Sequence, residues 1–133
     1  MNKNIIKFDG YSITKFFMEK KDINDEKKGK LEINCKSFKS EKKEEKNIYK
    51  LCLSIVVYTK DAVIELDING FFKIVDNLEK EVIMDFLGIT APTIIYPYAR
   101  AFISNVTSFD SGETVVLPVI NFADPNIRTK FEE

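Results

Sequence analysis

Apolar and polar residues alternate along two consecutive stretches, residues 49–59 and 62–68, with a tight reversal at Lys60-Asp61 between them. The first stretch places five apolar side chains on one face, and the second continues the same parity. Strict alternation is typical of a strand with one buried face, and a short reversal joins strands that run antiparallel. The sequence therefore predicts an antiparallel sheet at the centre of the fold.

Two further strands precede this hairpin. Residues 11–19 carry apolar side chains on both parities, which indicates a strand that is apolar on both faces. Residues 30–36 alternate regularly, so one face of that strand is exposed to water. Residues 40–47 mix both charge signs without an apolar residue, which predicts an exposed hairpin loop, with a partner-binding charge patch as the alternative. Asn69-Gly70 interrupts the fourth strand, and we expect a bulge or a bend there.

Two helices are predicted after the strands. Asp76 and Glu79 have the spacing of an N-cap box, and apolar residues at helical spacing continue to a stop at Gly88. A second, longer helix is expected to begin near Ile94 to Pro97, because proline is tolerated in a first turn. Residues 112–133 contain two prolines and predict extended chain, with a C-terminal helix that is short or absent. Residues 1–133 are thus expected to form one α+β domain, an antiparallel sheet of about four strands with helices packed on one face.

The longer helix carries two apolar stripes. The first is expected to face the sheet and consists of Ile95, Tyr98, Phe102, Val106 and Phe109. The second consists of Tyr96, Ala99 and Ile103. A helix that is apolar on two sides needs two partners, so the second stripe is predicted to face another subunit. The alternative is that the segment from Leu117 to Phe122 folds back over it.

Composition excludes several classes of function. The chain has no histidine, and its five glycines stand too far apart for a phosphate-binding loop, so we expect neither an enzyme nor a metal site nor a cofactor. A net charge of −1 gives no field that would attract nucleic acid. No apolar run approaches the roughly 18 residues of a membrane span, and the first residues lack the apolar core of a signal peptide. We expect a cytoplasmic protein without direct membrane insertion.

Three segments carry a resemblance to a known family. Residues 91–100 end in Pro-Tyr-Ala-Arg and resemble the helix-entry signature of the SecB export chaperones, which reads close to C-P-N-x-L-F-P-Y-A-R. Residues 117–122 resemble the family's P-P-V-N-F stretch, with one extra apolar residue, and residues 69–74 correspond to its Gly-x-Phe-x-Ile piece. The resemblance implies a SecB-like fold and an ATP-independent holdase. Such a chaperone binds unfolded or precursor polypeptides and forms a homo-oligomer, a tetramer built as a dimer of dimers.

The resemblance also suggests partner surfaces. Glu65 matches an acidic position on the family's exposed sheet face, so Glu65 and Asp67 are candidates for docking on the SecA motor ATPase. The near-neutral charge, the short C-terminus and Phe16, which stands where the family often has an acid, depart from that pattern. An alternative is a non-catalytic adaptor or regulatory protein, such as a SecB-like chaperone of a toxin–antitoxin system.

Aromatic residues are the candidates for binding clients. Eleven phenylalanines and five tyrosines exceed the needs of an ordinary small core, although packing within that core is the simpler explanation for most of them. By analogy with the family, the candidates for a client-binding groove are Phe71, Phe72, Ile74, Tyr96, Phe102, Phe109 and Phe122.

Overall fold

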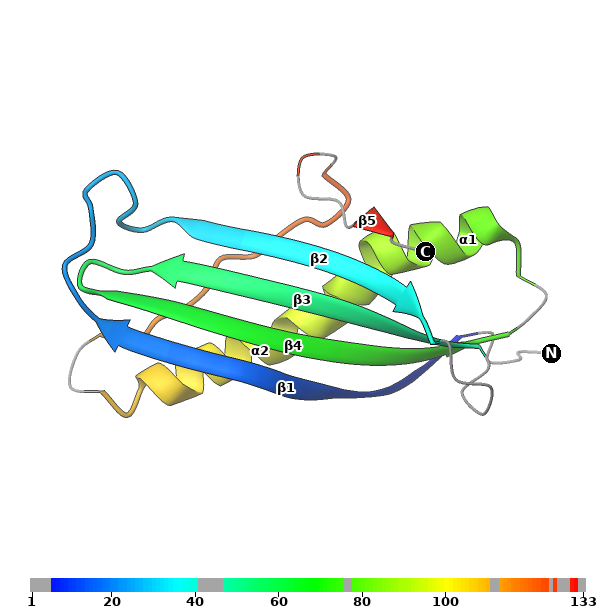
Figure 1. The fold of residues 1–133 in the computed structure, drawn as a ribbon, viewed down its shortest axis with the longest axis horizontal. Coiled ribbons are helices and arrows are strands. Elements are labelled where there is room, and N and C mark those ends of the chain that lie inside the picture. The colour runs from blue at the N-terminus through cyan, green and yellow to red at the C-terminus, as the bar shows by residue number, and fades with distance from the viewer. Residues whose placement is uncertain are drawn as a thin grey trace.

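The computed structural model describes residues 6–40, 47–75, 78–110, 113–124, 126 and 130–131. Four long strands form an antiparallel sheet: β1 (Ile6–Lys20), β2 (Leu31–Lys39), β3 (Ile48–Tyr58) and β4 (Ala62–Ile74). A fifth strand of two residues, β5 (Lys130–Phe131), pairs in parallel with β2. The order across the sheet is β1-β4-β3-β2-β5 (Figure 1). The predicted α+β class and the antiparallel sheet are confirmed.

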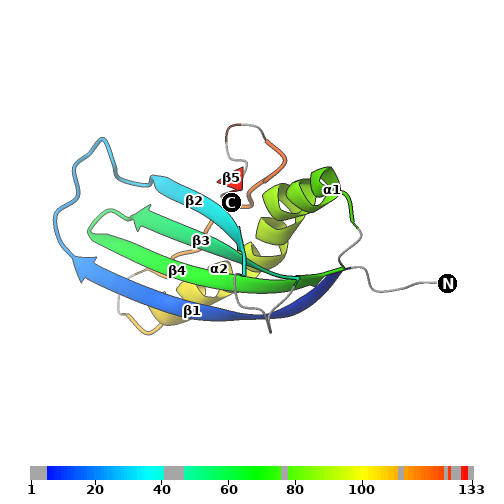
Figure 2. The same ribbon diagram turned by 45° about the vertical axis from the view of Figure 1, so that its right-hand side comes forward.

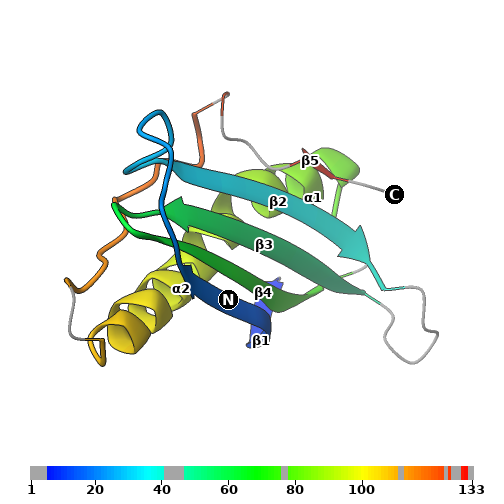
Figure 3. The same ribbon diagram turned by 60° about the vertical axis from the view of Figure 1, so that its left-hand side comes forward.

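One face of the sheet forms most of the core. Residues opposite each other on paired strands point to the same face of the sheet, so that Leu53 of β3 lies between Cys35 of β2 and Ile68 of β4. These three side chains are buried beneath the helices. The residues on the other side of these strands form the open face of the sheet, and apart from the buried Val63 they are polar or partly exposed (Figure 3). The alternation along β3 and β4 therefore predicted the buried face of both central strands.

The predicted irregularity at Asn69-Gly70 lies instead in the neighbouring strand. β4 pairs with β3 without a break through Gly70, whereas β1 shifts register between Phe8 and Tyr11 and again between Ile13 and Lys15. Gly10 lies in the first shift with φ of 102°, a backbone conformation that glycine adopts without steric cost. The bulge forms there because Gly10, and not Gly70, supplies the positive φ.

The two predicted helices are joined into one helical stretch. It comprises α1 (Lys80–Asp85), a π-helical turn η2 (Phe86–Thr90) and α2 (Ala91–Thr107). Gly88 is buried inside the π turn and does not end the helix. Pro92 has no N–H to donate to the preceding turn. The wider π turn lies just before this position, and so the helical stretch continues past Gly88 and Pro92. Asp76 lies outside the described residues, and Glu79 precedes the first helical residue without making a side-chain cap.

The helices cover one face of the sheet (Figure 1). By length and composition alone, the 28 residues of Lys80–Thr107 would also suffice for a membrane span, with a mean hydropathy of 1.3 in their most apolar window. The helix nevertheless packs across β3 and β4, as the core helix of a globular domain does. Residues 113–121, which follow the helix, are extended and run back along it, as Figure 2 shows in orange. Residues 41–46 of the predicted charged loop lie outside the described residues.

Candidate functional site

The most buried face of α2 lies on the sheet and fixes the other surfaces of the helix. Ile95, Ala99 and Ile103 have no exposed surface within the protomer. A Cβ atom added at Gly70 of β4 would overlap the Ile95 side chain, so the helix approaches the strand more closely than any other residue would permit. The stripe that faces the sheet is therefore Ile95, Ala99 and Ile103, which differs from the predicted stripe. The small residues Gly70 and Ala99 allow close packing, and the rings of Tyr98 and Phe102 lie at the edge of the sheet instead.

A second face of α2 binds the extended segment that follows it. We call residues 113–122 the C-terminal strap. Its backbone is held by four side chains spaced along the helix: Tyr96 donates to the carbonyl of Pro118 (2.6 Å), Arg100 to Leu117 (2.8 Å) and Ser104 to Val115 (3.0 Å), while Thr107 accepts from the Val115 N–H (2.9 Å). Leu117 and Phe122 of the strap are buried, and the Phe122 ring packs on Tyr96.

The strap corrects the predicted subunit interface. Tyr96, Ala99 and Ile103 are buried within the protomer, by the strap or by the sheet. The segment from Leu117 to Phe122 folds back over α2, as the alternative to a subunit interface predicted. Side chains of α2 donate hydrogen bonds to its carbonyl groups and hold it there. Burial raises the pKa of the Tyr96 phenol, an effect that Arg100 partly offsets.

A third face of α2 forms an aromatic edge with β1, the outermost strand. Tyr98 stacks on Tyr11 with ring centroids 4.4 Å apart, and Phe102 meets Phe16 edge to face at 5.2 Å. Tyr11, Phe16 and Tyr98 each keep more than a third of their surface exposed. The apolar residues on both parities of the first strand carried a signal for this surface, but sequence reasoning did not join Tyr11 and Phe16 to the helix.

The residues predicted for a client groove are distributed over several environments. Phe72, Ile74, Tyr96 and Phe122 are buried in the core. Phe102 belongs to the aromatic edge, and Phe71 lies half-buried on the opposite, open face of the sheet. Phe109, in the turn that follows α2, is 82% exposed. Among the large apolar side chains that the structure describes, Val116 and Val119 of the strap are with Phe109 the most exposed, at 65% and 84%, and sequence reasoning did not single them out.

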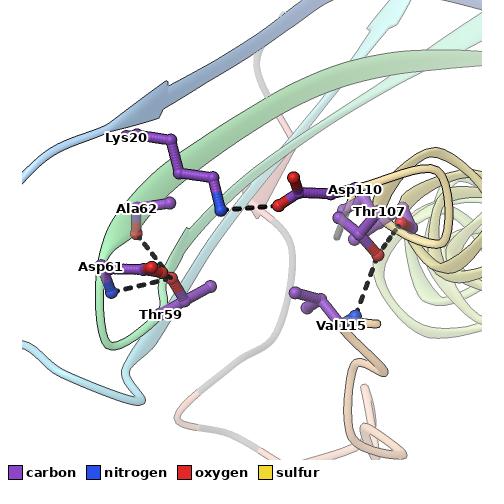
Figure 4. A network of polar contacts seen from close by, with 8 residues as sticks. Lys20, Thr59, Asp61, Ala62, Thr107, Asp110 and Val115 are labelled. Carbon is purple, nitrogen blue, oxygen red and sulfur yellow. Dashed lines mark hydrogen bonds and ion pairs between the residues drawn. The ribbon is translucent and has the colours of Figure 1, made fainter. Parts of the chain in front are cut away.

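A cavity of about 290 Å³ with a mixed polar and apolar lining lies between the end of β1, the β3–β4 turn, the end of α2 and the start of the strap. Lys20 of β1 forms an ion pair of 2.6 Å with Asp110, which also raises the pKa of Lys20 (Figure 4). Thr59 holds the β3–β4 turn through the backbone of Asp61 and Ala62, and all three line the cavity (Figure 4). The ion pair joins the last residue of β1 to the turn that follows α2.

The open face of the sheet carries the predicted acidic residues. Glu65 and Asp67 are two residues apart on β4, so both lie on this face, and both are partly exposed. The Lys15 ammonium group of β1 lies 3.9 Å from the Glu65 carboxylate. Cys52 lies on the same face, and burial raises the pKa of its thiol. Among the residues that the structure describes, no group of three or more histidine, cysteine, aspartate or glutamate side chains could hold a metal ion.

Comparison with known proteins identifies the family. Residues 16–126 match the family model described as preprotein translocase subunit SecB. The chain belongs to the SecB family. The SecB match covers β2, β3, β4, the whole helix and the strap, so it includes every surface described above except the first part of β1.

Curated SecB relatives match over part of their length. The protein-export protein SecB of Methylobacillus flagellatus is 36% identical over 83 residues, which are 59% of this chain and 52% of that protein. The SecB of Magnetococcus marinus is 32% identical over 102 residues, or 74% of this chain and 64% of that protein. The chain thus spans between about half and two thirds of the length of these relatives.

Solved structures share the fold. The SecB-like chaperone Rv1957 of Mycobacterium tuberculosis, solved with a ChAD peptide from the HigA1 antitoxin, superposes with a TM-score of 0.64 at 10% identity, covering 86% of this chain and 90% of that one. A Streptococcus agalactiae protein of unknown function superposes with a TM-score of 0.55, also at 10% identity, covering 86% of this chain and 97% of that one.

Proposed function

We propose that the chain is an ATP-independent holdase that binds unfolded polypeptides, including precursors destined for export. The match of residues 16–126 to the SecB family carries this proposal. Holding an unfolded chain needs accessible apolar surface and no catalytic group. We assign the binding of such segments to the most exposed apolar residues, Phe109, Val116 and Val119, with Phe71 and Phe102 as further contacts.

The strap supports this assignment. Its backbone is fixed to α2 by Tyr96, Arg100 and Ser104, while Leu117 is buried and Val116 and Val119 are exposed. An anchored segment presents these valines without losing further backbone entropy on binding. Phe72, Ile74, Tyr96 and Phe122 then contribute by forming the core beneath this surface.

The assembly belongs to the same proposal. A homo-oligomer, a tetramer built as a dimer of dimers, would bring several apolar surfaces within reach of one client and raise its avidity. Because Tyr96, Ala99 and Ile103 are buried within the protomer, we assign the interface to the aromatic edge, with Tyr11, Phe16 and Tyr98 as its exposed part. Glu65 and Asp67 remain the proposed docking surface for the SecA motor, and the cytoplasm remains the proposed location.

A chaperone of a toxin–antitoxin system is the second candidate. It is favoured by the fold shared with the Mycobacterium tuberculosis SecB-like chaperone, which was solved with a peptide of the HigA1 antitoxin. The two candidates differ in breadth of clients. An export chaperone should bind many unfolded proteins, and a dedicated antitoxin chaperone should bind one segment strongly and unrelated unfolded proteins weakly.

The decisive experiment follows aggregation of an unrelated, chemically unfolded protein by light scattering. We expect suppression at near-stoichiometric amounts of the chain without nucleotide, and it should persist in about 0.5 M salt because buried apolar area carries the binding. Exchanging Phe109 for Glu should weaken suppression, whereas Asn105→Glu, the same charge at an exposed position in the last turns of α2, should not. A requirement for ATP, or equal effects of the two exchanges, would contradict the proposal.

A further inference from the structure

The C-terminal strap is held to α2 through one of its two backbone edges. Val115 donates its N–H to a side chain of α2 (Figure 4), and the carbonyls of Val115 and Leu117 accept from two further side chains of that helix. In an extended chain, the N–H and C=O groups of successive residues point to opposite sides. The backbone groups of Thr114 and Val116 therefore point away from α2.

The second edge of the strap carries unpaired backbone groups. Within the part of the chain that the structure describes, the N–H and C=O groups of Thr114 and Val116 form no hydrogen bond. Both residues are exposed, so these groups are open to solvent, as unpaired backbone groups must be. An edge of this kind is a template on which a further extended segment can form backbone hydrogen bonds.

Pro118 limits the length of this free edge. It has no N–H, and its carbonyl accepts a hydrogen bond from Tyr96 on the side of α2. The alternation that places Thr114 and Val116 on the free edge is thus interrupted at Pro118. A short edge gives only a few hydrogen bonds and fixes no long register, so it tolerates many sequences and releases a bound segment readily.

The side chain of Val116 determines which segments bind best. It is exposed, whereas the side chain of its neighbour Leu117 is buried. Side chains directly opposite each other on paired strands lie in contact. A segment therefore gains affinity from an apolar residue opposite Val116, while its backbone hydrogen bonds depend on no particular sequence. The two contributions together suit an apolar client of varied sequence.

We propose that an extended segment of an unfolded client adds to the free edge of the strap as a strand, through the backbone of Thr114 and Val116 and an apolar side chain beside Val116. This mode of binding rests on the proposed holdase function and specifies the conformation in which a client is held. Unfolded chains offer continuous backbone N–H and C=O groups, whereas folded proteins pair these groups or protect their edge strands. An unfolded segment is therefore the occupant that this edge fits.

The variants Val116→Pro and Val116→Ala separate the backbone contact from the side-chain contact. Proline retains an apolar side chain and an extended backbone but lacks the N–H, and alanine retains the N–H but little of the side chain. The probe is a short synthetic peptide of alternating valine and threonine with a fluorescent label, and its anisotropy reports binding to the full chain. We expect Val116→Pro to weaken binding about fivefold or more, because one hydrogen bond is lost and its partner on the peptide stays unpaired. Val116→Ala should weaken binding less.

Hydrogen exchange, measured by nuclear magnetic resonance, checks that the strap keeps its position. The Val115 amide donates to α2 and should stay protected in Val116→Pro, whereas the Val116 amide of the parent chain should become protected only when peptide is bound. The same peptide with a methyl group on every backbone nitrogen keeps its side chains and should bind the parent chain about fivefold more weakly or worse. If Val116→Pro exposes the Val115 amide, the methylated peptide decides the question on the parent chain.

Two results would overturn the proposal. The first is equal binding of the plain and the methylated peptide by the parent chain, which would assign client binding to side chains alone. The second is a lower particle mass of Val116→Pro in multi-angle light scattering without peptide, which would assign the edge to a second copy of the chain. The aggregation assay tests the holdase separately: if the parent chain suppresses aggregation but binds both peptides equally, strand addition fails and the holdase stands.

Discussion

The contact between Gly70 and Ile95 shows how a missing side chain determines the position of a whole helix. Ile95 has no exposed surface and occupies the space where a Cβ atom of residue 70 would lie. Any larger residue at position 70 must push α2 away from β4 or distort the Ile95 rotamer. The glycine in the family-like segment Asn69–Ile74 is thus explained by close packing and not by a bend in the strand.

Gly70→Ala tests this contact at the scale of one residue. We expect a loss of about 1–3 kcal/mol in the free energy of unfolding, because the overlap cannot be relieved without moving the helix. Urea unfolding measures it. In a double-mutant cycle, Ile95→Ala should rescue part of the loss, since it removes the atoms that the new methyl group meets. Additive losses from the two exchanges would show that the contact does not set the helix position.

At the scale of elements, the strap is held by side chains of α2 that bind its backbone. Tyr96, Arg100 and Ser104 each donate to a carbonyl, and so the interaction depends on the extended shape of the strap more than on its sequence. The Pro-Tyr-Ala-Arg motif, residues 97–100, supplies one of the three donors, Arg100, and Tyr96 directly precedes it. The residues that resemble the family signature therefore also form a structural contact between α2 and the strap.

The phenol of Tyr96 makes this contact sensitive to high pH. Burial raises its pKa above the usual 10.0, so its contribution to stability is complete below pH 10 and is lost as the pH rises through the folded-state pKa. We expect unfolding midpoints to fall steeply in this range, and the Tyr96→Phe variant to lack part of that fall. Hydrogen exchange of the Val119 and Ile120 amides should report loosening of the strap. An identical pH profile in the variant would contradict the role of the phenol.

The predictability of each element depended on how local its determinants are. The strands around Leu53 and Leu66 follow from alternation within a few residues, and their antiparallel pairing follows from the short turn. The continuation of the helix through Gly88, the bulge at Gly10 and the coverage of Ile103 depend on contacts between distant segments. The candidate surfaces likewise depend on contacts between distant segments. The sequence shows how many aromatic residues there are, but it does not show which rings are buried, as the ring of Phe122 is.

At the scale of the molecule, the part of the protomer that the structure describes has one long side without cover. β1 is the outermost strand, and the rings of Tyr11, Phe16 and Tyr98 lie beside it with a third or more of their surface exposed. An exposed edge strand with adjacent aromatic rings is a surface that proteins normally cover, since both unpaired backbone groups and apolar area remain in water. The opposite side of the sheet is closed differently, because β5 pairs with β2 there.

The neighbours Phe16 and Phe17 allow a matched test of the proposed assembly. They are similarly exposed, at 36% and 40%, but Phe16 packs on Phe102 at the aromatic edge and Phe17 lies across from Glu65 on the open face. A glutamate buried unpaired at an interface costs on the order of several kcal/mol. We therefore expect Phe16→Glu to give a smaller particle by multi-angle light scattering, with circular dichroism close to that of the parent chain, while Phe17→Glu keeps the full assembly. If Phe17→Glu alone reduces the particle mass, the subunits meet through the open face and the aromatic edge is left for clients.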